Sequence, residues 1–253
     1  MLPEADTAEI VFGPLRCTKC HASFPVAEGV VDLVVEREAP SGLQRGLERP
    51  WVARSYERYL RPAVTLALSR RRFDRESEYL LYRSLLGTPT APVLDLCCGT
   101  ALFARRLARE PNMPTVIALD VSKAMIEEAV AQAREANATV DFVRAEAPLL
   151  PFADEALGAI LQAGSLHFIA DADRLFGEIA RVLRPGGRYV ATSYLPPRFG
   201  AGLHHRAGLY PRSEAELRGA LTDVGLVGFE RMVMPPFLLV KAEKPRRERH
   251  TVH

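Results

Sequence analysis

From about residue 90 onward, short apolar stretches alternate with longer segments in which apolar residues recur every three or four positions. The first pattern is typical of strands buried on both faces, and the second of helices with one buried face. The expected strands cover 92–96, 115–119, 140–143, 159–162 and 189–193, and a closing pair covers 229–234 and 237–241. The expected helices cover 101–110, a segment that Ser122 can cap, 171–183 (ended by Pro185-Gly186-Gly187) and 213–223.

Alternation of this kind is typical of a parallel sheet with helices on both faces. We therefore predict an α/β fold with a Rossmann-like, doubly wound sheet. The sheet is mostly parallel, and its final hairpin strand is antiparallel. In such sheets ligands bind beyond the carboxyl ends of the strands, near the point where the strand order reverses.

The residues before this pattern form two smaller units. Residues 1–40 are short, apolar and turn-rich, with a strand expected over 29–35, and they end at a Pro-Ser-Gly linker signal. Tyrosines and leucines at helical spacing predict helices over 43–86. The expected organisation is an appendage over 1–40, a helical lid over 41–88, an α/β domain over 89–243 and a basic tail over 244–253.

Composition adds limits to this picture. The 253 residues are 48% hydrophobic with a formal net charge of +2, which is ordinary for a globular protein and gives no general argument for nucleic acid. No apolar run is long enough for a membrane span, and residues 1–10 hold no signal-peptide core, so we expect a cytoplasmic protein. Nine arginines crowd residues 45–75. They are either a solvated helix face or a contact for an anionic partner.

The segment 93–104 carries the first candidate chemistry. A buried strand runs into small residues and then into a helix, so a ligand can approach the backbone and its unpaired N–H groups. The turn has one glycine, Gly99, which argues against a pyrophosphate. Asp95 at the strand end suits a ligand with an ammonium and a sulfonium, or else it caps the next helix. Asp120, 21 residues after Gly99, stands where a carboxylate binds ribose hydroxyls.

Four ordered motifs in residues 90–243 resemble those of class I S-adenosylmethionine-dependent methyltransferases, in the broad group of ubiquinone and menaquinone C-methyltransferases. Residues 95–101 resemble the family's D-x-G-x-G-x-G loop, and 117–125 its second-strand motif. Residues 144–152 resemble its D-A-x-x-L-P-F segment, and 178–187 its E-x-x-R-V-L-K-P-G-G segment. The resemblance implies S-adenosylmethionine as the cofactor.

The resemblance also implies a set of cofactor-binding residues. Asp95 and Gly99 would frame the methionine part, and Asp120 the ribose. The full set is Asp95, Cys97, Gly99, Thr100, Ala101, Asp120, Val121, Met125, Glu146, Ala147, Gln162 and Tyr56. Val121 or Met125 would contact the adenine, Glu146 would accept from its amino group, and Tyr56 of the lid would close over the cofactor. Cys97 and Ala101 replace two glycines of the family loop, which leaves it less free to take positive φ.

The appendage contains the pair Cys17 and Cys20 with His21 beside it. A closed structural zinc site needs four ligands, and this segment offers half of a zinc ribbon. We interpret it as a ribbon remnant without metal that docks through Phe24, Val26, Val31 and Leu33. The following residues 49–58 faintly resemble the linker of plastid-type methyltransferases with such ribbons, which favours a small acceptor over RNA.

Methyl transfer from a sulfonium needs alignment more than acid–base help. His167, after the fourth strand, is the candidate catalytic base, with His204 and His205 as further histidines near the acceptor. An insertion over 194–210 with Phe199, Leu203, Leu209 and Tyr210 predicts an apolar lid face. We therefore expect a small hydrophobic or aromatic acceptor in secondary or quinone metabolism, methylated on oxygen or carbon. The alternatives are an RNA (guanine) methyltransferase and a non-catalytic binding protein. The oligomeric state stays open, a homodimer included.

Overall fold

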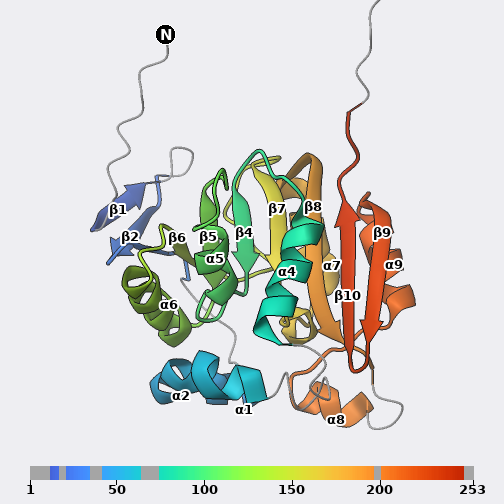
Figure 1. Cartoon of the computed structure of the whole chain (residues 1–253), viewed down its shortest axis with the longest axis horizontal. Coiled ribbons are helices and arrows are strands. Elements are labelled where there is room, and N and C mark those ends of the chain that lie inside the picture. Colours follow the sequence, from blue (N-terminus) through green and yellow to red (C-terminus); the bar gives the residue numbers. More distant parts are fainter. Residues whose placement is uncertain (1–11, 17–20, 35–41, 64–73, 197–200, 248–253) are drawn as a thin grey trace, which may run out of the picture.

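The computed structural model describes residues 12–16, 21–34, 42–63, 74–196 and 201–247. One ten-stranded sheet runs through the molecule in the order β1-β2-β3-β6-β5-β4-β7-β8-β10-β9 (Figure 1). Its strands are β1 (Gly13–Arg16), β2 (Ser23–Ala27), β3 (Val30–Asp32), β4 (Val93–Leu96), β5 (Val116–Asp120), β6 (Asp141–Arg144), β7 (Leu157–Gln162), β8 (Leu183–Tyr194), β9 (Val227–Met234) and β10 (Phe237–Glu243).

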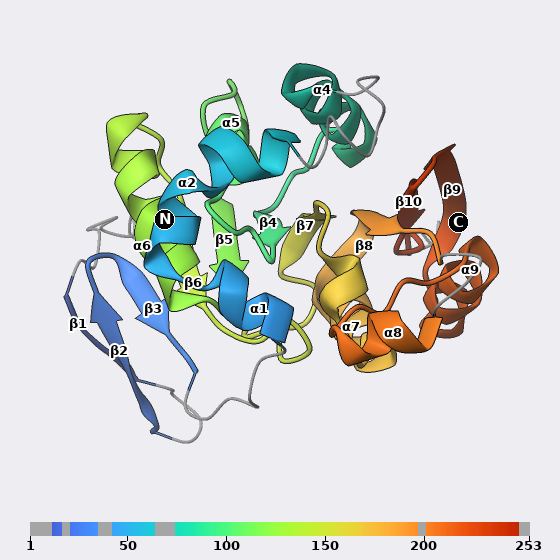
Figure 2. The ribbon, with the colours of Figure 1, turned by 90° about the horizontal axis from the view of Figure 1, so that it is seen from below.

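The helices lie on both faces of the sheet and below its carboxyl edge. They are α1 (Gly42–Leu47), α2 (Pro50–Ser55), the π-helix η1 (Tyr56–Leu60), α4 (Arg75–Leu86), α5 (Leu102–Leu107), α6 (Lys123–Glu135), the 3-10 turn η2 (Leu166–Phe168), α7 (Ala172–Val182), α8 (Ala201–Arg206) and α9 (Glu214–Asp223). Seen from below, α4, α5 and α6 lie on one side of the strands, and α7 and α9 on the other (Figure 2). The predicted α/β class is therefore confirmed.

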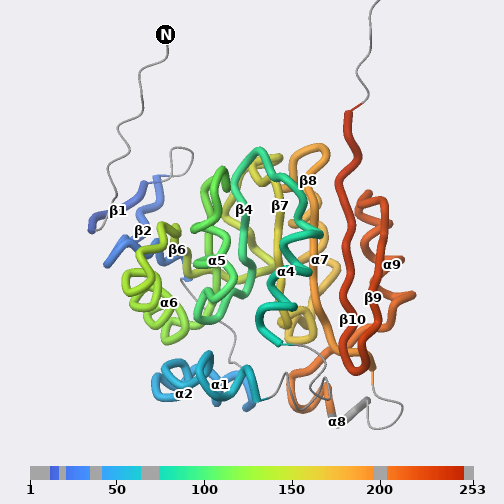
Figure 3. Tube along the Cα trace, viewed as in Figure 1, coloured from blue at the N-terminus to red at the C-terminus, as the bar shows by residue number. Residues whose placement is uncertain are grey.

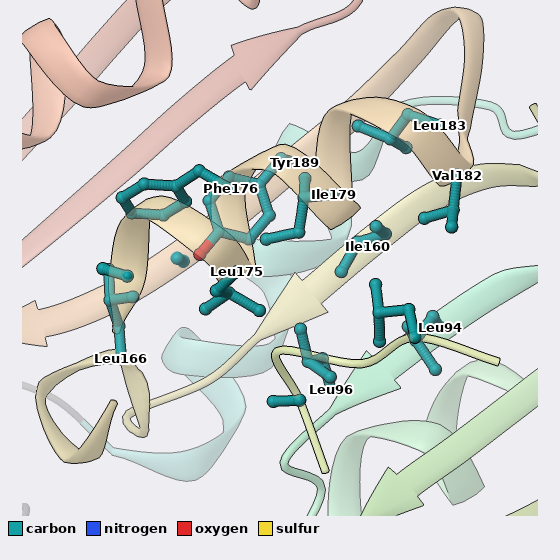
Figure 4. Packing of buried hydrophobic residues seen from close by; sticks show 14 of the residues in the cluster. Leu94, Leu96, Ile160, Leu166, Leu175, Phe176, Ile179, Val182, Leu183 and Tyr189 are labelled. Carbon is teal, nitrogen blue, oxygen red and sulfur yellow. The ribbon is translucent and has the colours of Figure 1, made fainter. Parts of the chain in front are cut away.

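Successive side chains of the central strand β4 pack on opposite faces of the sheet. Leu94 and Leu96 are fully buried against α7, whose Leu175, Phe176 and Ile179 form the centre of that core (Figure 4). Val93 packs into a second core with α4, α5 and α6. Such alternation is what a strand buried on both faces requires, because successive side chains point to opposite sides.

The final strands form the predicted hairpin. β10 pairs antiparallel with β8 and with β9, at the edge of the sheet opposite to β1–β3 (Figure 3). One detail of the prediction is wrong: Pro185-Gly186-Gly187 does not separate a helix from a strand, because β8 already begins at Leu183. Gly186 takes a φ of +80° there, and its N–H donates to the Lys244 carbonyl oxygen at 2.8 Å. The turn thus becomes a bulge within the pairing of β8.

The N-terminal strands continue the sheet. β3 pairs parallel with β6, and Arg144 of β6 binds the Asp32 carboxylate at 2.8 Å. Val26 is buried, and Leu33 packs against the first core, in line with two of the four expected docking residues. The sequence reading did not anticipate the main-chain pairing. Cys17 and Cys20 lie outside the described residues, so the absence of metal stays a prediction.

The expected lid region divides in two. The helix α4 packs its buried Tyr79, Tyr82 and Leu86 onto the sheet and belongs to the helical layer. In contrast, α1, α2 and η1 lie below the carboxyl edge of the strands (Figures 1 and 2). We call α1, α2 and η1 the first lid, and the insertion over 194–210 the second lid. Phe199 of the second lid lies outside the described residues, while Tyr210 lies beside the cavity described next. Within the described ranges, no helix is long and apolar enough to cross a membrane.

Candidate functional site

A cavity of about 490 Å³ opens at the carboxyl ends of β4, β5 and β7. The strand order reverses at β4, which lies between β5 and β7 while the chain winds away on either side. This is the place where doubly wound sheets bind ligands, and the volume is usual for a small-molecule site. Ten of the predicted cofactor residues line it: Tyr56, Asp95, Cys97, Gly99, Thr100, Asp120, Val121, Met125, Glu146 and Ala147.

The loop after β4 adopts three left-handed residues in alternation. Cys97 has φ +54°, Gly99 +55° and Ala101 +57°. A non-glycine residue in this region costs about 1–2 kcal/mol, so the two replaced glycines leave strain in the loop. The backbone therefore takes positive φ at Cys97 and Ala101 although neither is a glycine, and backbone strain of this kind is common at ligand sites.

Asp95 is 1% exposed and lines the cavity from the end of β4. Its Oδ2 accepts a hydrogen bond from the Ala104 N–H at 3.0 Å, so it also caps the first turn of α5. Burial raises the pKa of this carboxyl to about 7, against the opposing effects of the Ala104 N–H and of Arg61. A buried carboxylate with free acceptor capacity is favourable for a cationic ligand group.

Asp120 ties the loop to β5. Its Oδ2 accepts from the Gly99 N–H at 2.9 Å, and its Oδ1 accepts from the Ser122 N–H at 2.8 Å. Both bonds hold the carboxylate against the loop, and Asp120 also lines the cavity. Ser122 in turn caps α6 by accepting from the Met125 N–H at 3.3 Å, as the sequence predicted.

The two cysteines of the loop are not nucleophiles. Burial raises the pKa of both the Cys97 and the Cys98 thiol, and the nearby Asp120 and Asp95 carboxylates raise them further. A thiolate is the reactive form of cysteine, so both side chains act as small apolar residues.

Three predicted residues do not line the cavity. Ala101 is fully buried at the start of α5, and Gln162 is fully buried and accepts from the Tyr189 hydroxyl at 2.6 Å. His167 is 2% exposed, between the rings of Phe168 and Tyr194 at 4.4 and 4.1 Å. Burial lowers the pKa of His167 to about 3, so the ring is neutral and weakly basic.

The rod formed by α2 and η1 reaches over the loop. The Tyr56 ring lies above Gly99, where an added β-carbon would be 3.8 Å from the tyrosine Cε1. Glu57 accepts from the Thr100 hydroxyl at 3.0 Å and pairs with Arg105 of α5. These contacts place the inner face of the rod, Tyr56 included, at the mouth of the cavity.

Arg61 is a cavity residue that sequence reasoning missed. Its Nη2 donates to Glu78 Oε1 at 2.7 Å, while its Nη1 is buried and has no partner among the described residues. An unpaired buried guanidinium nitrogen is costly unless a ligand accepts from it. The only sequence signal was its place in an arginine-rich stretch, which does not single out one arginine from its neighbours.

Aromatic and apolar side chains from two further segments line the cavity, beside the charged Asp171 and Arg206. Phe168 and Ile169 line it from the segment after β7, and His205 and Tyr210 line it from the second lid. The His205 and Tyr210 rings are stacked at 5.4 Å. Tyr210 is held in place because its N–H donates to the His167 carbonyl oxygen at 2.7 Å. His167 thus supports the cavity wall through its backbone.

Comparison with known proteins agrees with this geometry. Residues 93–187 match the family described as "Methyltransferase domain". An uncharacterized chloroplastic methyltransferase of Arabidopsis thaliana is 30% identical over 91% of this chain and 71% of its own length. The demethylmenaquinone methyltransferase of Thermus thermophilus is 36% identical over 45% of this chain and 52% of its own length. The chain thus spans most of the first relative and about half of the second.

Among solved structures, phosphoethanolamine N-methyltransferase 2 of Haemonchus contortus in complex with S-adenosyl-L-methionine has the same fold. Its TM-score is 0.66 at 17% identity, over 88% of this chain and 62% of the other. The sheet and its cavity define a doubly wound α/β protein with a ligand site at the switch point. The chain belongs to the S-adenosylmethionine-dependent methyltransferases. The family and cofactor predicted from the sequence are confirmed, whereas the roles of single site residues stay predictions.

Proposed function

We propose that the enzyme methylates oxygen or carbon of a small hydrophobic or aromatic acceptor of quinone or secondary-metabolite type. The observation that carries the proposal is the mixed lining of the cavity. Beside the carboxylates Asp95 and Asp120, its wall includes Phe168, Ile169 and Tyr210. Aromatic and apolar side chains of this kind suit an aromatic or apolar acceptor. The name of the Thermus thermophilus relative, a demethylmenaquinone methyltransferase, supports the quinone type.

The residues present fit the cofactor. Asp120 would accept from the ribose hydroxyls, and Val121 and Met125 would pack against the adenine. Glu146 and the Ala147 N–H, which follow β6, would contact the adenine edge. Asp95 and the left-handed loop around Gly99 and Thr100 would hold the methionine part, with Asp95 opposite its ammonium.

The unpaired Arg61 Nη1 supports a contact with the cofactor's carboxylate. Arg61 lies within electrostatic range of Asp95, because its charge lowers the pKa of that carboxyl. Arg61 and Asp95 would therefore clamp the carboxylate and the ammonium of one amino-acid group. A cofactor analogue without the carboxylate should bind about tenfold or more weakly, since charged hydrogen bonds contribute about 1.5–3 kcal/mol. Equal affinity for the two compounds would remove Arg61 from this role.

The bound cofactor supplies a methyl group that is already activated on a sulfonium. The chain itself then has to align the acceptor and exclude water. Tyr56 from the first lid and Tyr210 from the second border the cavity from two sides, in keeping with this task. His205, which lines the cavity, is the histidine placed to take a proton from an acidic hydroxyl.

Labelled methyl transfer to a panel of quinols, phenols and polyketide-like acids, with bulk RNA beside it, tests the acceptor class. We expect transfer to at least one small aromatic compound. Robust labelling of RNA that falls steeply with salt, and of none of the small molecules, would favour the RNA alternative instead.

His167→Ala in the same assay tests for a general base. Because His167 is buried behind the wall with a pKa of about 3, we expect turnover to fall by less than about fivefold. A drop of about a hundredfold with unchanged cofactor affinity would restore it as the base.

A further inference from the structure

The first lid has an outer face that the methyltransferase site does not use. On the helical rod of α2 and η1, the inner residues Tyr56 and Arg61 line the cavity. The outer side carries Trp51 and Tyr59, each 62% exposed, and Leu60 at 36%. The neighbouring α1 adds Leu43, which is 42% exposed. Four large apolar side chains gathered on two short adjacent helices are more than scattered surface hydrophobes require.

The same face is basic. Arg45, Arg49, Arg54 and Arg58 are exposed on α1, α2, η1 and the turn between the helices. Arg58 lies over the Tyr59 ring at 5.3 Å, so cationic and aromatic groups alternate at close range. The two acidic residues of this stretch face inward, because Glu57 pairs with Arg105 and Glu48 lines the cavity. Four exposed arginines against two glutamates leave a net positive charge on this stretch.

We propose that this outer face, defined by Leu43, Trp51, Tyr59, Leu60 and the four arginines, docks the enzyme on an anionic lipid bilayer. Surface helices bind bilayers in this way when apolar and aromatic side chains enter the interface and arginines contact anionic headgroups. Tryptophan and tyrosine prefer that interface because one end of each is apolar and the other polar. The inference goes beyond the proposed reaction and does not depend on it.

The side chains of this outer face, and its place beside the cavity, favour a bilayer over single-stranded RNA as the partner. Leu43 and Leu60 have no π-face on which a base could stack, whereas both can enter the acyl boundary. The outer face and the cavity also share one rod, since Tyr56 lines the cavity whereas Trp51, five positions earlier, does not line it and is largely exposed. A docked lid would therefore hold the mouth of the cavity next to an acceptor dissolved in the membrane.

Trp51 is the only tryptophan of the chain, which gives the test a built-in probe. Full-length protein is mixed with vesicles of phosphatidylcholine alone, or of phosphatidylcholine with phosphatidylglycerol, and followed by Trp51 emission and by flotation. We expect a blue shift and flotation with the anionic vesicles only, and loss of both as salt rises.

Variants sharpen the test. Arg54→Glu/Arg58→Glu should weaken partitioning by about tenfold or more, since each basic residue near an anionic surface contributes about 1 kcal/mol. The control is Arg109→Glu, an exposed arginine two residues after the end of α5, and its partitioning should stay within about twofold. Circular dichroism melting checks that each variant is folded. If a variant does not fold, the salt dependence of vesicle binding by the unaltered protein still tests the proposal.

Three results would overturn the inference. The first is the absence of flotation with anionic vesicles. The second is a Trp51 shift caused by RNA at lower concentration than by vesicles. The third is a shift that depends on protein concentration alone, which would make this face a contact between two copies. None of them bears on methyl transfer, so the proposed function is tested separately.

Discussion

At the scale of residues, the Asp120 carboxylate has two tasks. It accepts from the Gly99 and Ser122 N–H groups and so fixes the loop, and it faces the cavity where the ribose would lie. Asp120→Ala should weaken S-adenosylhomocysteine binding by about 1.5–3 kcal/mol through loss of charged hydrogen bonds. Asp120→Asn, whose single carbonyl oxygen can still accept from either the Gly99 or the Ser122 N–H, is the control for loop collapse. Affinity of the alanine variant within twofold of the parent would contradict the ribose assignment.

Asp95 gives the site a pH dependence. Its pKa of about 7 in the folded chain lies above the ordinary range, because burial disfavours the charged form. Below pH 7 the carboxyl is mostly protonated and neutral, and above pH 7 it is ionised and can attract an ammonium group. Cofactor binding should therefore weaken as the pH falls from 8 to 6, by up to about tenfold per unit at the acidic side.

Calorimetric titration with S-adenosylhomocysteine at several pH values measures this effect, and Asp95→Asn should flatten the profile. A profile that is already flat in the parent enzyme would mean that Asp95 keeps a low pKa or does not face the ammonium.

Only part of the residues that line the cavity could be predicted from the sequence. Ten of twelve predicted cofactor residues line the cavity because strand ends in a parallel sheet converge on one edge, a rule that the sequence pattern can exploit. Arg61 was not predicted, since it comes from a lid segment whose placement depends on tertiary packing, whereas His205, expected near the acceptor, does line the cavity. The predicted His167 instead occupies a wall position, because the turn η2 directs its ring between Phe168 and Tyr194.

At the scale of elements, Glu57 is the contact that holds the first lid to the cofactor loop. Its carboxylate is part-buried and serves both Thr100 and Arg105. Glu57→Gln should weaken S-adenosylhomocysteine binding about fivefold or more and lower stability by about 1–3 kcal/mol, because the neutral amide can still accept a hydrogen bond but no longer compensates the charge of the part-buried Arg105.

Glu76→Gln is the matched control for this change. Glu76 also pairs with an arginine of α5, Arg106, but its side chain is 63% exposed, and exposed pairs contribute little to stability. Its cofactor affinity should stay within twofold. Equal effects of the two substitutions, measured by calorimetry and thermal melting, would argue against a lid held by Glu57.

Most elements were predictable because their patterns are local. The cap of α6 by Ser122 and the capping box of Ser213 and Glu216 at α9 follow from residues that stand next to the helices. Two features were not local. The pairing of β3 with β6 joins residues more than a hundred positions apart, and the bulge at Gly186 depends on a bond to Lys244 near the end of β10.

At the scale of the molecule, a single ten-stranded sheet carries the cofactor cavity at the carboxyl edge of its central strands. The N-terminal strands extend this sheet, and two lid segments border the cavity. The cytoplasmic location and the oligomeric state stay predictions, and the Arabidopsis thaliana relative is described as chloroplastic. The central claim is that the cavity at the ends of β4, β5 and β7 binds an adenosyl cofactor.

Isothermal titration of the folded, full-length chain with S-adenosylhomocysteine tests that claim most directly. We expect one site per chain, and competition between this compound and S-adenosylmethionine for it, because the motif residues line one cavity. The Asp120→Ala variant should lose most of the heat signal at the same concentrations. Absence of binding of either compound by protein shown to be folded would contradict the account.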